Sequence, residues 1–416
     1  MQLYAASYVL PVEGPPIPGG ALAVEAGEIV ALGTLDILRA VCPGPVTEYP
    51  GCVIMPGLVN AHSHLELTHF PSWKMRHGMD YAPRTFVDWL IQVVKVRRGL
   101  TADDIRQSVR EGIRISLESG TTAMGEILTC RDLIPLYVES PLAGRLYFEA
   151  IGQEPAHCET LLRELGQAAT LSSGGFLPGL SPHTPYTLSE SFGRELGKRA
   201  REWLLPCAIH VAESAAEGAF LFDSTGPLAD TFYPHVHWEQ YLPPPRKSTA
   251  VRYLDALGLL TPETVAIHCV HVTPGDAAIL KEREVSIVLC PRSNDRLNVG
   301  KAPAHLFKKL GIPLALGTDS LASNDSLSLF DEMRYVEQQW PGLFPPEELI
   351  YLATLGGARA LGLGEVTGSL QPGKRADFLV VEAEGTPDQL PERIIGEGKL
   401  IELFVQGIPL AELARS

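Results

Sequence analysis

The chain has 416 residues, of which 45% are hydrophobic and 20% are charged, and this balance is typical of a globular protein. Its 49 acidic and 34 basic residues give a net charge of −15, which disfavours nucleic acid and anionic membranes as partners. The seven scattered cysteines form no CxxC pair, so we expect no disulfide framework. No segment has the roughly 20 apolar residues that span a bilayer, and no signal peptide is recognised, so we expect a cytoplasmic protein.

The two ends of the chain share one pattern. Residues 1–55 alternate short apolar runs with turns rich in Pro and Gly, and the segment from about 368 onward repeats this style. We therefore expect one small β-sandwich domain built from residues 1–56 and 366–416.

The central part, residues 57–365, alternates short apolar segments with helical ones. Residues 103–120 read as an amphipathic helix that ends at Gly120. The strands are expected at residues 52–64, 121–127, 144–152, 174–183, 205–213, 264–271, 285–291 and 313–319. Eight such units predict an α/β fold, a (β/α)8 TIM barrel, whose chemistry lies at the carboxyl ends of the strands. The long segment 222–248 is expected to cover the mouth, and the sequence leaves open whether it closes as a lid.

Polar side chains that can bind a metal stand at the ends of five of these segments. They are His62 and His64, His183, His210 with Glu213, His268, and Asp319. A single histidine at a strand end is more often structural, but this series converges on one end of the predicted barrel. Residues i and i+2 of a strand face the same side, so the first pair alone predicts half of a metal site. Imidazole and carboxylate ligands suit one divalent ion, Zn²⁺ first, with Fe²⁺ and Mn²⁺ left open.

These motifs resemble those of the amidohydrolase superfamily, in its cytosine deaminase-like and chlorohydrolase-like branch. The matching stretches recur in order along the chain as PGLVNAHSH, SPHTPYT, HVAES, AIHCVH, LCPRSN, LGTDSLASNDSLSLFDEM and GSLQPGKRADFLVV. The resemblance implies a metal-dependent hydrolase in which His62, His64, His210 and Asp319 hold the ion. Relatives that lose these ligands act as scaffolds, and the presence of the whole set here argues against that alternative.

The resemblance also assigns roles around the ion. It implies that Glu213 shuttles protons to the leaving nitrogen, that His268 polarises the hydrolytic water, and that Asp319 helps to deprotonate it. The fourth strand ends in GLSPHTPYT, without the lysine that bridges two metals in some members. This difference favours one metal ion and leaves His183 for the substrate, although a packing role under the ligands is the alternative.

The first barrel loop bears on the substrate. NAHSHLE followed by FVDWL and a basic helix resembles the aminodeoxyfutalosine deaminases, which implies deamination of an adenine-type ring in a nucleoside-like small molecule, 6-amino-6-deoxyfutalosine first. Trp89 is expected to stack on the ring or to belong to the core, and Asp88 and Glu66 to face the pocket. Asn294 lies either at a purine edge or in a plain turn. S-adenosylhomocysteine, methylthioadenosine or guanine deamination and triazine dechlorination remain alternatives, and the assembly stays open, with a homodimer as the commonest form.

Overall fold

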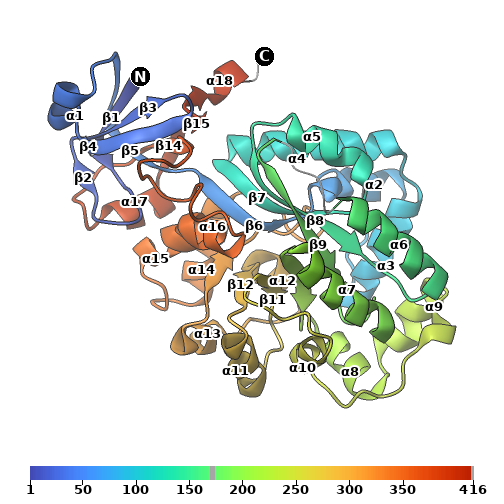
Figure 1. The fold of residues 1–416 in the computed structure, drawn as a ribbon. Helices are drawn as coiled ribbons and strands as arrows, with labels where there is room; N and C mark the ends of the chain where they lie inside the picture. The colour runs from blue at the N-terminus through green and yellow to red at the C-terminus, as the bar shows by residue number, and fades with distance from the viewer. Residues whose placement is uncertain (169–173, 414–416) are drawn as a thin grey trace.

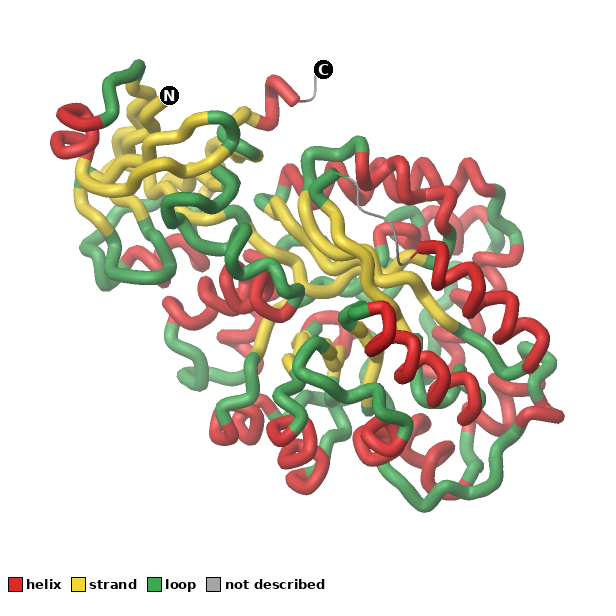
Figure 2. Tube along the Cα trace, viewed as in Figure 1, coloured by secondary structure: helices red, strands yellow, loops and turns green. Residues whose placement is uncertain are grey.

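The computed structural model describes residues 1–168 and 174–413. Two eight-stranded sheets organise the chain, one formed by residues near both ends and one by the residues between them (Figures 1 and 2). The second sheet is a nearly closed barrel of parallel strands surrounded by helices. The predicted fold class is therefore confirmed.

The barrel strands follow one another in chain order. They are β6 (Leu58–Ser63), β7 (Thr121–Leu128), β8 (Ala143–Ala150), β9 (Phe176–Pro182), β10 (Cys207–Val211), β11 (Thr264–His268), β12 (Ser286–Leu289) and β13 (Leu314–Leu316). Most of their residues are buried, as expected for a parallel sheet covered by helices. Beyond β13, the Asp319 amide donates to the carbonyl oxygen of His62 at 3.1 Å, and this bond joins the eighth strand end to the first.

Helices cover the outside of the barrel. Before β7 lie η1 (Leu65–Leu67), α2 (Phe70–Arg76), α3 (Phe86–Arg98) and α4 (Ala102–Glu118). Between β7 and β11 lie η2 (Arg131–Leu133), α5 (Ile134–Val138), α6 (Pro155–Ala168), α7 (Glu190–Trp203), α8 (Ala215–Asp223), η3 (Leu228–Phe232), α9 (Tyr233–His235), η4 (Glu239–Tyr241) and α10 (Ala250–Ala256). The later helices are α11 (Pro274–Glu282), α12 (Pro291–Arg296), α13 (Ala304–Leu310), α14 (Leu329–Gln339), α15 (Pro346–Tyr351), η5 (Leu352–Gly356) and α16 (Gly357–Ala360).

Helix α4 shows how the local sequence sets these boundaries. Thr101 accepts a hydrogen bond from the Asp104 amide, and the Asp104 carboxylate accepts from the Thr101 amide, which forms a capping box. The chain leaves the helix at Gly120, whose φ of +96° favours glycine. The predicted helix thus has the signals for its start and its stop.

The terminal sheet joins residues from both ends of the chain. Its strands are β1 (Gln2–Val9), β2 (Ile17–Pro18), β3 (Gly20–Glu25), β4 (Glu28–Thr34), β5 (Val46–Pro56), β14 (Phe378–Glu382), β15 (Lys399–Val405) and β16 (Ile408–Pro409), with helices α1 (Leu35–Val41), α17 (Leu390–Gly396) and α18 (Leu410–Leu413). The sheet is mixed, because β5 runs parallel to β1 and antiparallel to β14. The stacked rings of Phe378 and Phe404 lie at its core, and the ring of Tyr4 packs against both at a tilt. The expected range 366–416 includes residues 414–416, which lie outside the described residues.

Residues 52–64, expected as one strand, divide between the two sheets. Strand β5 ends at Pro56 in the terminal sheet, and β6 starts at Leu58 in the barrel. Gly57 lies between them, where an added Cβ would come within 2.1 Å of the Thr122 hydroxyl oxygen. Only glycine therefore lets the chain pass so close to β7 before it delivers the NAHSH motif to the barrel.

The segment 222–248 is more regular than a loop. It contains η3, α9 and η4, and its Phe232 and Tyr233 are buried. The Tyr233 hydroxyl donates to the carbonyl oxygen of Tyr186 at 2.9 Å, so the segment supports the chain that follows β9. It is anchored in the barrel core by these aromatic side chains.

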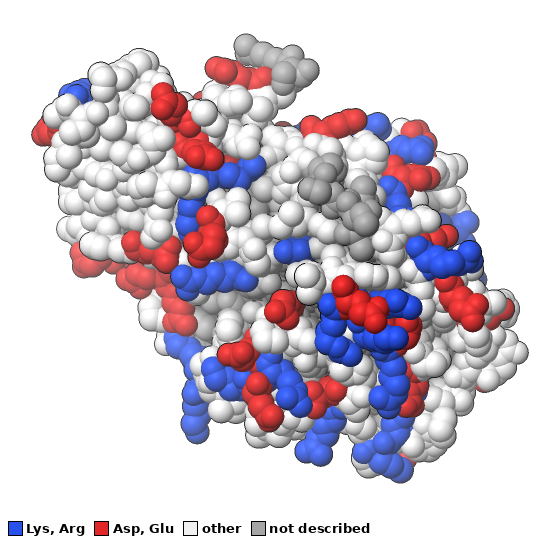
Figure 3. All heavy atoms as spheres, viewed as in Figure 1, with Lys and Arg blue, Asp and Glu red and all other residues white. Residues whose placement is uncertain are grey.

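Charged side chains of both signs lie next to one another across the barrel helices (Figure 3). Helix α7 carries several such pairs, among them Arg194 with Glu190 and Arg199 with Glu195. Exposed pairs of this type contribute about 0.3–0.5 kcal/mol each, so the stability of the barrel rests on its buried apolar residues. Across residues 1–168 and 174–413, every helix is too short or too polar to span a bilayer.

Candidate active site

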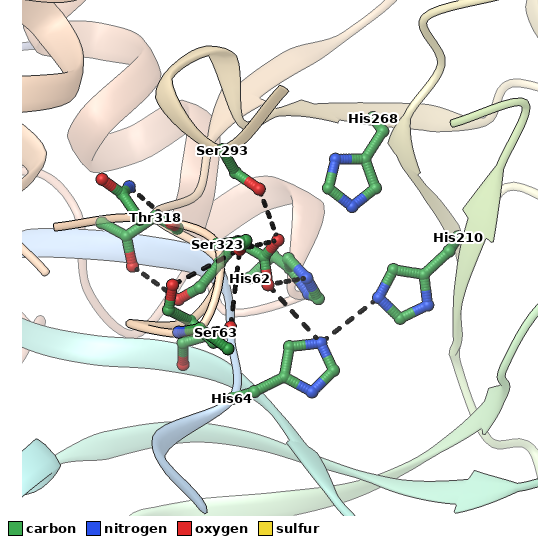
Figure 4. A network of polar contacts seen from close by, with 12 residues as sticks. His62, Ser63, His64, His210, His268, Ser293, Thr318 and Ser323 are labelled. Atoms are coloured by element: carbon green, nitrogen blue, oxygen red, sulfur yellow. Dashed lines mark hydrogen bonds and ion pairs between the residues drawn. The ribbon is translucent and has the colours of Figure 1, made fainter. Parts of the chain in front are cut away.

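The histidines of the NAHSH motif meet the ends of the fifth and eighth strands (Figure 4). Nε2 of His62 lies 3.6 Å from Oδ1 of Asp319, and Nε2 of His64 lies 3.8 Å from the same oxygen. Nε2 of His64 is also 3.3 Å from Nε2 of His210. Four side chains that the sequence spreads over more than half of its length thus meet at one point.

A second pair of contacts fixes the junction of β6 with the end of the eighth strand. The Asn60 amide group donates to the Thr318 hydroxyl at 2.8 Å and accepts from the Thr318 backbone N–H at 3.1 Å. Both residues are fully buried. The asparagine of the motif therefore has a structural task, which is to hold the strand end that carries Asp319.

Three strand ends at the site have left-handed backbone conformations. The φ angles are +50° at Ala212, +69° at His268 and +58° at Asp319. For residues other than glycine, this conformation costs about 1–3 kcal/mol each and persists only where the surroundings enforce it. The strain lies at the turns that aim the side chains of His210, Glu213, His268 and Asp319 into the barrel mouth.

The donor set fits a divalent metal ion. Both ring nitrogens of His62 are buried without a hydrogen-bond partner among the described residues, which is costly unless an ion takes the place of a partner. Nδ1 of His210 donates to the carbonyl oxygen of His183 at 3.0 Å, which leaves Nε2 with its lone pair directed to the site. Burial lowers the pKa values of His64 and His210 well below their usual range, so both are neutral, as metal ligands must be.

Two hydroxyl groups orient the carboxylate of Asp319. Ser293 and Ser323 donate to Oδ2 at 2.7 and 2.8 Å, which leaves Oδ1 facing the histidines. Burial acts to raise the pKa of Asp319, but the surrounding histidines outweigh it and hold this pKa well below its usual range. Asp319 is therefore an ionised carboxylate whose Oδ2 accepts hydrogen bonds from the protein and whose Oδ1 is available as a ligand.

Glu213 lies on the other side of the site, with Oε1 3.5 Å from Nε2 of His268. Burial, and then the charges of Asp319 and Glu217, raise its pKa well above the usual range. The backbone N–H groups of Ala212 and Glu213 donate to the two carboxylate oxygens of Glu217 at 3.0 and 2.9 Å. Glu217, which the sequence did not single out, thus fixes the turn that presents Glu213.

The neighbouring histidine has its own partner. Nδ1 of His268 donates to Oδ1 of Asn294 at 2.9 Å, so its Nε2 is available as an acceptor. Burial lowers the pKa of His268 to about 4, although Asp319 acts in the opposite direction. Asn294 is buried behind His268 and does not line the cavity, so it orients the imidazole.

A cavity of about 420 Å³ opens above these groups. Its floor carries His64, His210 and Asp319 of the metal-binding group together with Glu213 and His268, and its apolar wall includes Phe86, Trp89, Leu90, Val93 and Tyr186. The indole N–H of Trp89 donates to the carbonyl oxygen of Ala322 at 3.0 Å, which fixes the ring plane at the wall. This wall of the cavity is therefore apolar and partly aromatic.

The remaining predicted site residues lie in different places. His183 lines the cavity, with Nδ1 3.1 Å from the Thr187 hydroxyl. Asp88 lies in the first turn of α3, where its N–H donates to Thr85, and it does not line the cavity. Glu66 is buried below the wall, and Arg97 donates to it at 3.2 Å. Glu66 therefore touches the cavity only through Arg97, which does line it.

Three charged cavity residues were not singled out from the sequence. They are Arg97 and Arg98 at the end of α3, and Glu149 at the end of β8. Glu149 follows the same rule as the predicted residues, because it is a polar side chain at the carboxyl end of a barrel strand. From the sequence, the two arginines could be recognised only as part of a basic helix. Nothing in the sequence indicates which face of that helix turns toward the mouth of the barrel.

Comparison with known proteins identifies the family. The model of the amidohydrolase family matches residues 53–408, so this chain belongs to that family. An aminodeoxyfutalosine deaminase of Deinococcus radiodurans is 34% identical over 360 residues, which cover 84% of this chain and 82% of the relative. A 5-methylthioadenosine/S-adenosylhomocysteine deaminase of Nitratidesulfovibrio vulgaris is 32% identical over 381 residues, which cover 88% and 79% of the two chains.

The fold comparison agrees. The crystal structure of Helicobacter pylori aminofutalosine deaminase in complex with methylthio-coformycin matches with a TM-score of 0.87 and 21% identity, over 99% of this chain and 100% of that chain. The family is metal-dependent and the relatives are deaminases. This chain is thus a hydrolase that acts on carbon–nitrogen bonds.

Proposed function

We propose that this amidohydrolase removes the amino group of an adenine-type ring in a nucleoside-like molecule, with 6-amino-6-deoxyfutalosine as the first candidate. The observation that carries the proposal is the floor of the cavity, where Glu213 faces His268 and Asp319 below a slot lined by Trp89. The aminodeoxyfutalosine deaminase relative supports the choice of substrate.

His62, His64, His210 and Asp319 would hold one divalent ion, with Zn²⁺ as the first choice because imidazole and carboxylate suit it. When bound, such an ion supplies Lewis-acid activation of water, whose pKa falls to about 7. The first proton that the water loses needs an acceptor. Oδ1 of the ionised Asp319 can accept it, because the two serines donate only to Oδ2.

Glu213 is suited to the second proton transfer. Burial raises its pKa well above the usual range, which favours the protonated form that can donate to the ring nitrogen next to the carbon under attack. The second proton of the water then passes through Glu213 to the amino group, and the first returns from Asp319 to restore the proton that Glu213 gave to the ring nitrogen. The carbon–nitrogen bond breaks and ammonia leaves, while the water oxygen stays on the ring as a carbonyl group. Positioned acid–base catalysis of this type contributes about 10²–10⁴-fold to the rate.

The other side chains bind and orient. His268, with Nδ1 committed to Asn294, accepts a hydrogen bond at Nε2 from the attacking oxygen. His183 is neutral, because burial and then Arg97 lower its pKa to about 4, and it can hydrogen-bond to a ring nitrogen. Trp89 offers its indole face to the ring, where stacking adds about 0.5–1.5 kcal/mol beyond burial.

A second candidate is the deamination of S-adenosylhomocysteine or methylthioadenosine. The Nitratidesulfovibrio vulgaris relative supports it at nearly the same identity as the first. The same floor and slot serve both candidates, since each carries an adenine ring. Guanine deamination and triazine dechlorination have no feature of this cavity in their favour over these two.

Ammonia release by the metal-loaded protein tests the proposal. The panel contains 6-amino-6-deoxyfutalosine, S-adenosylhomocysteine, methylthioadenosine, adenosine, adenine, guanine and cytosine, with Glu213→Gln as the control protein. We expect the highest kcat/KM for 6-amino-6-deoxyfutalosine and loss of nearly all turnover in the variant. A preference for methylthioadenosine or S-adenosylhomocysteine would select the second candidate. No ammonia from any adenine compound, or chloride from a triazine, would overturn both.

A further inference from the structure

The four side chains proposed to hold the metal ion are not fixed in the same way. Asp319 is oriented by two serines, and Nδ1 of His210 donates to the carbonyl oxygen of His183. The side chain of His62 is enclosed, with only 1% of it exposed. His64 differs, because 14% of its side chain is exposed on the cavity and no protein group among the described residues hydrogen-bonds to its Nδ1. The backbone on either side of His64 therefore has the most influence on where its ring points.

A buried glutamate of the neighbouring strand holds that backbone on both sides. Glu126 lies in β7, and its side chain is fully buried. The Ser63 hydroxyl donates to Oε2 of Glu126 at 2.5 Å, and the backbone N–H of Leu65 donates to Oε1 at 2.8 Å. These donors belong to the residues directly before and after His64, which lies between β6 and η1 with a φ of −133° and a ψ of 80°. One carboxylate thus spans the residue that carries the imidazole.

Further contacts keep this carboxylate and the spanned segment in place. The Tyr137 hydroxyl of α5 donates to Oε1 at 2.7 Å, and Tyr137 is fully buried. The carbonyl oxygen of Leu65 accepts from the Ser108 hydroxyl of α4 at 3.2 Å. A second contact runs the opposite way between the same strand ends, since the N–H of Thr129 after β7 donates to Glu66 after β6 at 2.7 Å. The two strand ends are thus held together in both directions.

We infer that Glu126 is a positioning residue of the proposed metal site, and that it sets the direction of the His64 imidazole by spanning residues 63–65. Glu126 does not line the cavity, so it acts through His64 and not on the substrate. The inference rests on the proposed function, because His64 is one of the metal ligands assigned there.

The contacts indicate that the reach of this side chain matters and not its acidity. Oε1 of Glu126 takes the backbone N–H of Leu65, which can only donate, whereas the Ser63 hydroxyl at Oε2 can also accept. A neutral amide of the same length can therefore replace the carboxylate, with the serine hydrogen bond reversed. An acid that is one methylene shorter cannot contact residues 63 and 65 at the same time.

Three variants of Glu126 and two controls test this role. Glu126→Gln keeps the length and removes the acid, Glu126→Asp keeps the acid and shortens the side chain, and Glu126→Ala removes both contacts. Tyr137→Phe is the structural control, because it removes a hydrogen bond to the same carboxylate but leaves residues 63 and 65 bound to it. Glu139→Ala, at an exposed acid that ends α5, is the surface control.

Two of the measurements need no turnover. Competition with a chelator gives the zinc affinity, and the visible absorption of the cobalt-substituted protein reports the ligand geometry. Partners that orient a metal ligand are worth about 10- to 100-fold in metal affinity or activity. We expect losses of this size in zinc affinity and in kcat for Glu126→Asp and Glu126→Ala, with an altered cobalt spectrum and a KM near that of the wild type. Glu126→Gln and both controls should keep the wild-type affinity and spectrum, although Tyr137→Phe should unfold at a lower temperature.

The comparison of the two conservative variants decides the matter even if the alanine variant folds poorly. A folded Glu126→Asp protein with the zinc affinity and cobalt spectrum of the wild type would overturn the inference. So would a Glu126→Gln protein that loses as much zinc affinity as Glu126→Asp, because the acid and not its reach would then govern the site.

The metal measurements also separate this inference from the proposed function. If Glu126→Asp binds zinc more weakly than the wild type but the wild type releases no ammonia from any adenine compound, the deaminase proposal fails and the positioning role stands. If ammonia is released and the zinc affinity is independent of Glu126, the positioning role fails alone. A wild type that binds no zinc would overturn both.

Discussion

Substitution of Glu217 by glutamine tests whether its carboxylate stabilises the turn that presents Glu213. Glu217 accepts from the N–H groups of Ala212 and Glu213, and Ala212 has a left-handed φ of +50°. A hydrogen bond to a charged group is worth about 1.5–3 kcal/mol, and the strained residue costs about 1–3 kcal/mol. Glutamine keeps one acceptor and turns an N–H group toward the second backbone N–H. The net stabilisation of the turn then falls to near zero or below.

We expect kcat of Glu217→Gln to fall about 10- to 100-fold, since about 1.4 kcal/mol corresponds to a factor of ten. KM and metal content should change little, because the variant leaves the cavity wall and the four metal-binding side chains intact. The assay is steady-state ammonia release with metal analysis of the same preparation. Glu263→Gln, at an exposed acid just before β11, is the matched control. A Glu217→Gln protein with the kcat and pH profile of the wild type would refute the reasoning.

Three further predictions concern the ion, the substrate and stability. His62→Ala should lose stoichiometric metal in elemental analysis, because it removes the imidazole whose two nitrogens have no hydrogen-bond partner within residues 1–168 and 174–413; full occupancy would remove it from the ligand set. His183→Ala should keep the metal and raise KM, because His210 is oriented by the backbone oxygen of residue 183 and not by its ring; an apo protein would contradict this. Burial raises the pKa of Glu332 from 4.5 to about 8, so between these pH values the folded protein binds a proton at Glu332 that the unfolded chain does not. The free energy of unfolding should therefore fall as pH rises from about 4.5 to about 8. Denaturant unfolding of Glu332→Gln should show a smaller fall, and an unchanged slope would exclude this group.

The sequence was sufficient for the barrel and for the side chains at its mouth, because both depend on local order along the chain. Apolar segments separated by helical ones indicate parallel strands, and polar residues at their carboxyl ends must meet at one edge. His62, His210 and Asp319 meet in this way. Glu149 satisfied the same rule and could have been found by it.

The parts that could not be predicted depend on packing between segments. Asp88 was expected in the pocket from its place beside Trp89, but successive residues of a helix point in different directions, and only Trp89 lines the cavity. Asn294 was left between a purine contact and a turn, and its contact with His268 comes from two adjacent strands. The division of residues 52–64 between two sheets follows from the close approach of Gly57 to Thr122, which no periodicity reveals.

The hydrogen bonds of the buried carboxylates distinguish those that stabilise the fold from those that face the cavity. Glu66, Glu126 and Glu217 accept hydrogen bonds from protein donors and do not line the cavity, so they stabilise the chain around it. Glu213 and Glu149 instead line the cavity, and burial raises the pKa of both. A group that is expensive to bury and has no protein partner is stabilised when a ligand arrives. Both nitrogens of His62 are buried without a hydrogen-bond partner among the described residues and suit a metal ion, whereas the two carboxylates open on the cavity, where a bound molecule would meet them.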